Sequence, residues 1–147
     1  MQKVQMEDLE NIQFISSPEF NQDGKWLAFI RTQANLEDND YQSDVWLYDV
    51  EKKASWQLTA SEEVTGFAWL NESNLVFKAN RKAKDKEKAK KEEFTNIYRI
   101  YIHGGEAVKL FKVPALISGF TMLDDETCLF LMESDLHGKN LFDLKKD

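Results

Sequence analysis

The chain has little of what several classes of protein require. Its single cysteine, Cys128, cannot form an internal disulfide or a cysteine-based metal site. Because Cys128 lies in a strand-like pattern, we expect it to be a buried, small hydrophobic residue. No run approaches the roughly 20 apolar residues that a membrane-spanning helix needs, and residues 1–10 lack the apolar core of a signal peptide. The sequence therefore predicts a cytoplasmic protein with no membrane partner.

The chain also lacks an excess of basic residues over acidic ones. The 147 residues carry a net charge of −7, which argues against a nucleic-acid partner. Residues 81–93 are the exception, with seven basic and four acidic side chains. Alanine, lysine and glutamate favour a helix, but this segment has no apolar face with which to dock. We interpret it as a solvated insertion prone to disorder, rather than as an anion-binding surface.

The parts of a catalytic triad are missing as well. No serine lies in a Gly-x-Ser-x-Gly elbow, and Ser118, although followed by a glycine, lies in a strand pattern. The two histidines, His103 and His137, each precede a glycine and are expected in exposed turns. We assign no catalytic, cofactor-binding or metal-binding residue, expect no cofactor, and expect this chain alone not to be an enzyme.

What the chain does contain is a hairpin that occurs three times. In its first copy the pair Asp23-Gly24 separates two hydrophobic runs, which predicts a tight turn with positive φ at both residues. Phe29, Phe77 and Phe130 end equivalent hairpins, 48 and 53 residues apart. A repeat of this length is typical of propellers and solenoids.

Each repeat predicts a four-stranded antiparallel meander, which is the blade of a β-propeller. We expect an all-β fold with one partial propeller domain, 1–147, of about two and a half blades. Blade one covers about 12–60, blade two about 64–112 with the insertion 81–93, and blade three starts at 117–147. Within blade one, the polar stretch 32–42 is expected to be a loop. A β-sandwich is the alternative, and the regular spacing of the repeats argues against it.

Several of these stretches resemble propeller blades of the prolyl oligopeptidase family, in particular those of acylaminoacyl-peptidases and dipeptidyl-peptidases. The resemblance rests on Ser17–Phe29, Asp44–Asp49 and Trp56–Thr59, and Asn96–Ile100 and Gly104–Ala107 fit the same pattern. Members of this family of serine peptidases join a propeller to a C-terminal α/β-hydrolase domain that carries a Ser-Asp-His triad. Propellers of the TolB type, which have no catalytic partner, share the same blade motif.

The resemblance implies a noncatalytic N-terminal propeller fragment of a serine peptidase, a hydrolase that acts in proteolysis. Such a fragment would gate or select peptide substrates for an α/β-hydrolase domain of the parent chain, which is then its expected partner. The alternative is a noncatalytic TolB-type scaffold for protein–protein interaction.

Two acidic clusters invite a functional interpretation that we do not favour. Glu92-Glu93 is similar to the glutamate pair by which dipeptidyl peptidases hold a substrate's amino terminus, but neighbouring lysines would neutralise it. Glu37, Asp38 and Asp40 suggest a calcium loop, yet the spacing lacks the glycine and distal glutamate of an EF-hand.

An incomplete propeller also predicts self-association, because it leaves an unpaired blade face and an open strand edge. The apolar side chains expected near that exposed surface are Leu123, Leu129, Phe130 and Leu131.

Overall fold

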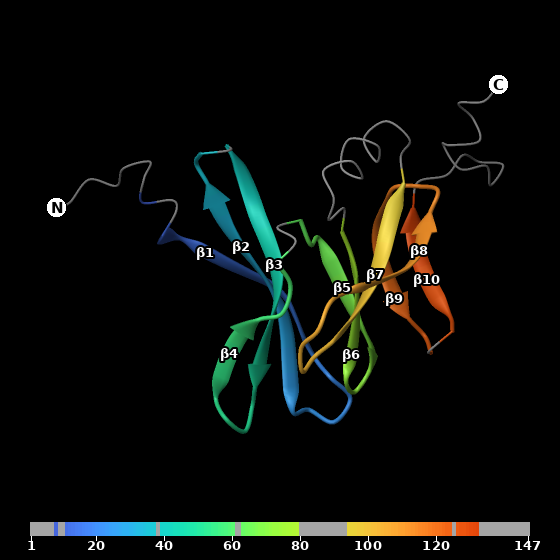
Figure 1. Ribbon diagram of the computed structural model, residues 1–147, viewed down its shortest axis with the longest axis horizontal. Coiled ribbons are helices and arrows are strands. Elements are labelled where there is room, and N and C mark those ends of the chain that lie inside the picture. The colour runs from blue at the N-terminus through green and yellow to red at the C-terminus, as the bar shows by residue number, and fades with distance from the viewer. Residues whose placement is uncertain are drawn as a thin grey trace. The chain divides into compact units, whose positions relative to one another are not determined.

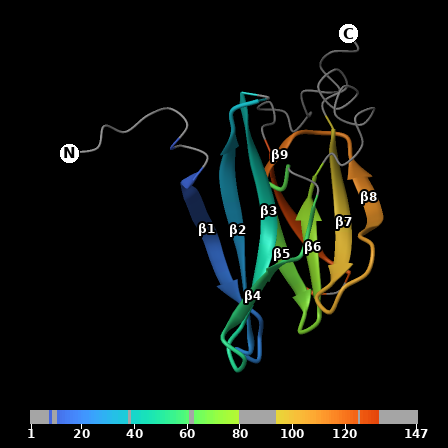
Figure 2. The same cartoon turned by 60° about the vertical axis from the view of Figure 1, so that its left-hand side comes forward.

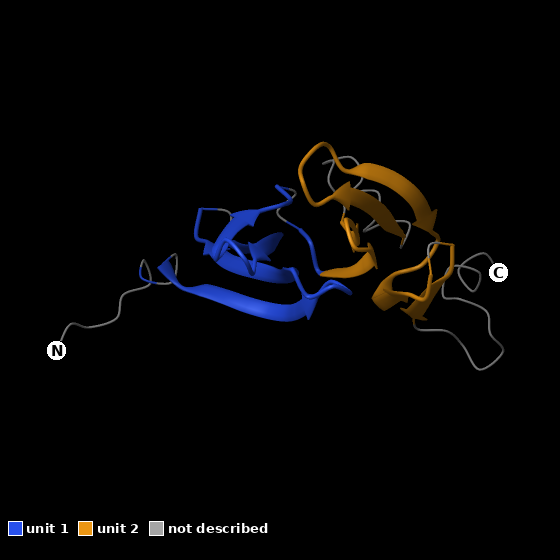
Figure 3. Cartoon of the chain, turned by 90° about the horizontal axis from the view of Figure 1, so that it is seen from below, with its two compact units in different colours: residues 1–65 blue, residues 66–147 orange. Residues whose placement is uncertain are grey.

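Ten β-strands and no α-helix make up the part of the chain that the computed structural model describes, which is residues 8, 11–37, 39–60, 63–79, 94–124 and 126–132. The strands form two four-stranded antiparallel sheets and one two-stranded sheet (Figure 1). The chain divides into two compact units, residues 1–65 and residues 66–147 (Figure 3). The expected all-β class and the antiparallel sheets are confirmed.

The first unit is one meander of four strands: β1 (Gln13–Phe20), β2 (Trp26–Asn35), β3 (Asp40–Asp49) and β4 (Ala54–Gln57). Each strand pairs with the next along the chain, in the order β1-β2-β3-β4 (Figure 2). Since only consecutive strands pair, short local turns are sufficient to define this sheet.

The edge strand β1 carries an irregularity at its proline. The register with β2 shifts between Ser16 and Glu19, and Ser17 has a φ of 52°. Pro18 has no backbone N–H to donate, so it is tolerated at an edge or a bulge and not in a central strand.

The expected loop over residues 32–42 is wrong for most of its length. Strands β2 and β3 continue their pairing through this stretch until Asn35 lies opposite Asp40. The polar side chains do not prevent a backbone ladder, and the Oγ atoms of Thr32 and Ser43 lie 2.8 Å apart across the pair. The two strands are therefore longer than hydrophobicity indicates.

The turn between β1 and β2 is larger than the two-residue turn expected at Asp23-Gly24. Only Gly24 has a positive φ, of 72°. Asn21 closes the turn: its backbone N–H donates to the Trp26 carbonyl, and its side-chain Oδ1 accepts from the Trp26 N–H, both at 2.9 Å. The hydrogen bonds of Asn21 thus close the turn, and no second residue with a positive φ is needed there.

The second unit repeats the meander with β5 (Gly66–Asn71), β6 (Asn74–Lys78), β7 (Thr95–Tyr101) and β8 (Val108–Val113). Their order is β5-β6-β7-β8. The turn after β7 contains two glycines with φ of 112° and 109°, as the sequence predicts. The insertion 81–93 lies outside the described residues.

A separate hairpin, β9 (Ile117–Met122) and β10 (Cys128–Met132), follows in the second unit. It packs on one face of the β5–β8 sheet around a cluster of buried residues: Ala68, Val76, Ile97, Val113, Ala115 and Ile117. The rings of Phe111 and Phe130 meet edge to face across this contact, with centroids 6.0 Å apart. The remainder of the expected third blade, residues 133–147, lies outside the described residues.

The connection from β8 to β9 is fixed by a buried threonine. The Thr95 hydroxyl donates to the Ala115 carbonyl at 2.9 Å and accepts from the Ile117 N–H at 3.2 Å. These two hydrogen bonds satisfy backbone groups that would otherwise be buried without a partner between the two sheets.

The hairpin side chains follow the alternation of the strands. Leu123, Leu129 and Leu131 are exposed, as expected. Phe130 is instead half-buried, because its position in the alternation turns it toward the cluster. Cys128 is also only half-buried, where the sequence predicts full burial, and burial raises the pKa of its thiol.

Candidate functional site

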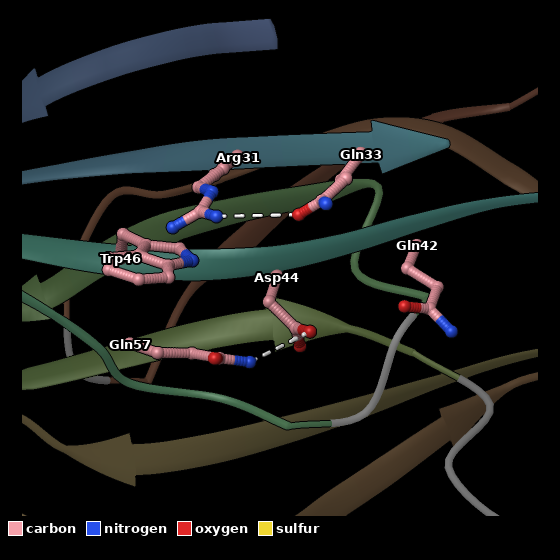
Figure 4. Close-up of a pocket in the computed structure, with 6 residues that line it drawn as sticks. All are labelled: Arg31, Gln33, Gln42, Asp44, Trp46 and Gln57. Atoms are coloured by element: carbon pink, nitrogen blue, oxygen red, sulfur yellow. Dashed lines mark hydrogen bonds between the residues drawn. The ribbon is translucent and has the colours of Figure 1, made fainter. Parts of the chain in front are cut away.

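A polar pocket of about 100 Å³ lies on one face of the β2–β3–β4 sheet in the first unit. Strand register places its lining side chains on this face: β2 contributes two of them, β3 three and β4 one. They are Arg31, Gln33, Gln42, Asp44, Trp46 and Gln57 (Figure 4). The pocket therefore joins one cation, one anion and three amides beside an indole ring.

Arg31 is held by an aromatic ring and not by an acid. The centre of its guanidinium group lies 4.3 Å from the centre of the Trp46 ring, and Nη2 donates to Gln33 Oε1 at 3.4 Å (Figure 4). Within the described residues, Arg31 forms no ion pair with a carboxylate. A guanidinium group at this distance from an indole ring is stabilised by a cation–π interaction.

Asp44 lies opposite Arg31 in the strand register but is bound from the other side. Its Oδ1 accepts from the Thr59 hydroxyl at 2.7 Å, and its Oδ2 accepts from Gln57 Nε2 at 3.1 Å. The Thr59 oxygen in turn accepts from the Val45 N–H at 3.0 Å. The acid thus ties the end of β4 to β3 and is engaged away from the guanidinium.

The opposite face of this sheet is mainly apolar. Ala28, Val45 and Leu47 have no exposed surface, and Trp26 and Trp56 pack edge to face with centroids 5.4 Å apart. The hydrophobic effect accounts for most of that face. The acid on it, Asp49, is buried and paired with Lys52.

Two of the residues considered for catalysis from the sequence, Ser118 and His103, have other contacts in the described part of the chain. Ser118 lies on β9, where its hydroxyl donates to the Leu131 carbonyl at 3.1 Å. His103 is exposed in the turn after β7, and its ring meets that of Tyr101 at 5.1 Å. His137 lies outside the described residues.

The acidic clusters give no metal centre in the described part of the chain. Asp38, Glu92 and Glu93 lie outside it, and among the described residues no group of three or more histidine, cysteine, aspartate or glutamate side chains could hold an ion. The described residues contain no helix that is long and apolar enough to cross a membrane.

The pocket was missed by the sequence analysis because its residues fall partly in the stretch taken for a loop. Gln33 and Gln42 belong to that stretch, and Arg31 and Asp44 flank it. A signal was present, since Arg31 and Gln33 alternate with neighbours on the other face as strand residues do. Polar residues on one face of a long hairpin resemble a loop when their partner strand is unknown.

The arrangement of these sheets defines a class of protein. Two successive four-stranded meanders, the second of them covered on one face by the next hairpin, are blades of a β-propeller. The sheets of the described residues remain open and do not close into a ring.

Solved propellers of peptidases share this fold. The chain resembles the β-propeller domain of the Trilobed protease from Pyrococcus furiosus, with a TM-score of 0.59 and 17% identity, over 82% of this chain and 35% of that one. It also resembles an acylaminoacyl peptidase from Pyrococcus horikoshii, with a TM-score of 0.59 and 17% identity, over 79% of this chain and 16% of that one. The resemblance to blades of prolyl oligopeptidase-family peptidases is thereby confirmed at the level of the fold.

A sequence relative points to the same class. The peptidase YuxL of Bacillus subtilis is 24% identical over 145 residues, which is 97% of this chain and 21% of YuxL. The chain therefore spans about a fifth of the length of that relative. No family model matches the chain.

Proposed function

We propose that this chain is the noncatalytic N-terminal propeller fragment of a serine peptidase of the prolyl oligopeptidase family. In the parent protein it would gate or select peptides for an α/β-hydrolase domain. The observation that carries the proposal is the match of its blades to propellers of peptidases, over 82% of the chain in one case and 79% in another.

The chemistry of the described residues is consistent with an accessory role. Ser118, a strand residue, donates its hydroxyl to a backbone carbonyl, whereas a nucleophile must be presented on a strained strand-to-helix turn. The triad would then come from the rest of a longer chain, and YuxL, of which this chain matches 21%, offers room for it.

We also propose that both compact units belong to one partial propeller domain, 1–147. The support is the packing inside the second unit, where the β9–β10 hairpin covers a face of the β5–β8 sheet as successive blades do. Self-association through the exposed hairpin leucines belongs to the same proposal. A cytoplasmic location stays a prediction, which fractionation of cells would test.

The proposal is tested by comparing two purified proteins on a library of short peptides. One is the 147-residue chain, and the other is the polypeptide encoded by its full reading frame. We expect the 147-residue chain not to hydrolyse the peptides and the longer protein to hydrolyse them. Replacement of the serine of its Gly-x-Ser-x-Gly elbow by alanine should abolish this activity. Hydrolysis by the chain itself would contradict the noncatalytic role.

The reading frame also separates the two candidate functions. A downstream α/β pattern with a Gly-x-Ser-x-Gly elbow supports the peptidase. Further blades without such a pattern support a TolB-type scaffold that binds proteins, and the peptidase proposal is then wrong.

A further inference from the structure

The internal repeat indicates which face of the first blade packs on a neighbouring blade. Phe29 and Phe130 occupy equivalent positions in their hairpins. In the second unit, Phe130 lies on the face of β9–β10 that packs on the preceding sheet, where its ring meets Phe111. The corresponding face of the first blade, which carries Phe29, is therefore the face by which a blade contacts the one before it.

The first blade has a different type of residue at the position that follows this phenylalanine by two. The second and third repeats have Ala79 and Met132 there, and both are small or flexible apolar residues that suit a packed interface. Ala79 is only 6% exposed, and Met132 packs against the core cluster. The first blade has Arg31 at this position. A charged side chain at this position distinguishes the pocket face of blade one from the corresponding faces of the other two repeats.

The surroundings of Arg31 are suited to receive a carboxylate. The Trp46 ring lies beside the guanidinium, and Asp44 accepts hydrogen bonds from Thr59 and Gln57 without forming an ion pair with Arg31, so the acid opposite Arg31 does not occupy its N–H donors. The side-chain amide of Gln42, which also lines the pocket, can supply further N–H donors. A volume of about 100 Å³ is sufficient for a carboxylate group.

We propose that the pocket around Arg31 and Trp46 is a carboxylate-binding site that receives an aspartate or glutamate side chain from a further blade of the parent polypeptide. That blade would pack on the Phe29 face of blade one. The fork of the guanidinium group binds a carboxylate through two parallel hydrogen bonds. The match covers 21% of YuxL, and the rest of a chain of that length could supply such a blade. The site does not depend on a hydrolase domain, because a binding propeller would need the same neighbour.

The experiment uses the 147-residue chain and two strand-forming probe peptides, acetyl-Lys-Val-Glu-Val-Lys-amide and the same peptide with glutamine at its centre. Binding is measured by NMR from the Trp46 indole N–H and the Arg31 Nε–H signals. We expect both signals to move, and the glutamate peptide to bind about tenfold more tightly than the glutamine peptide.

Three variants locate the effect. Arg31→Gln should remove the preference for glutamate, and Arg31→Lys should keep only part of it, because an ammonium group cannot form two parallel hydrogen bonds. Arg99→Gln, at an exposed arginine on β7, is the matched control and should leave the preference unchanged. The edge contact between the Trp26 and Trp56 rings, followed by nuclear Overhauser effects, shows that each variant is folded.

The proposal is overturned if neither peptide binds, if both bind equally, or if the preference survives in folded Arg31→Gln. A third probe, sodium acetate, distinguishes the source of the carboxylate. Acetate that moves the same signals at the same concentration as the glutamate peptide would show a site for any small anion and would contradict docking of a polypeptide.

Discussion

The ammonium group of Lys78 donates a hydrogen bond to the backbone carbonyl of Ser118, 40 residues away in the chain, at 2.8 Å. The same Nζ donates to the Ile117 carbonyl at 3.1 Å, so the end of β6 holds the start of β9. Lys78 is only 8% exposed, and this burial lowers the pKa of its ammonium group. A buried cation with two carbonyl acceptors joins the hairpin to the sheet at a cost in desolvation.

Replacement of Lys78 by methionine should reveal that cost through its pH dependence. Because the pKa is lower in the folded state, the unfolded chain binds more protons between that pKa and the ordinary pKa of lysine. The free energy of unfolding of the natural chain should therefore rise relative to Lys78→Met as pH increases through this window. Urea unfolding from about pH 7 to about pH 10 measures the difference. Lys109→Met, at an exposed lysine on β8, is the control and should show no such trend; a flat or falling difference for Lys78→Met would contradict the prediction.

Thr59→Val should destabilise the first unit by about 2–3 kcal/mol. The substitution keeps the shape of the side chain but removes the donor to Asp44 and the acceptor of the Val45 N–H, both of which are buried. Thr59→Ser keeps the hydroxyl and should cost less than half as much. Urea unfolding followed by tryptophan fluorescence makes the comparison, and equal losses for the two variants would show that the hydroxyl does not matter.

Gly24→Ala should destabilise the chain by about 1 kcal/mol. The φ of 72° is unfavourable for alanine, whereas an added Cβ would meet no atom within 4 Å, so the cost comes from backbone conformation alone. Gly24→Asn should cost less, because asparagine tolerates this region better. Thermal unfolding midpoints test the order, which would be wrong if alanine proved as stable as glycine.

Leu131→Lys should weaken self-association by about tenfold in dissociation constant, which corresponds to about 1.4 kcal/mol. Leu131 is 67% exposed on the outer face of the β9–β10 hairpin, beside Leu129. Leu116→Lys is the matched control, since Leu116 is 59% exposed but lies in the connection before the hairpin. Light scattering over a range of concentrations measures the mass, and a natural chain that stays monomeric throughout would contradict the prediction.

Local features of the sequence were sufficient for the repeat. The hairpins that end at Phe29, Phe77 and Phe130, and the glycine turn after β7, depend on alternation and on residues that tolerate positive φ. Both kinds of signal act over a few residues, so the all-β class and the propeller blades could be predicted from the sequence.

The pocket and the anchoring role of Lys78 could not be predicted from the sequence. Lys78 resembles an ordinary strand lysine until its acceptors, 39 and 40 residues away, are in place. Arg31 resembles an ordinary residue at the end of a strand until β3 brings Trp46 beside it. The sequence by itself determined the repeated hairpins and the glycine turn, because their signals are local. Only the tertiary structure decided which polar side chains become buried or oriented, because their partners come from distant parts of the chain.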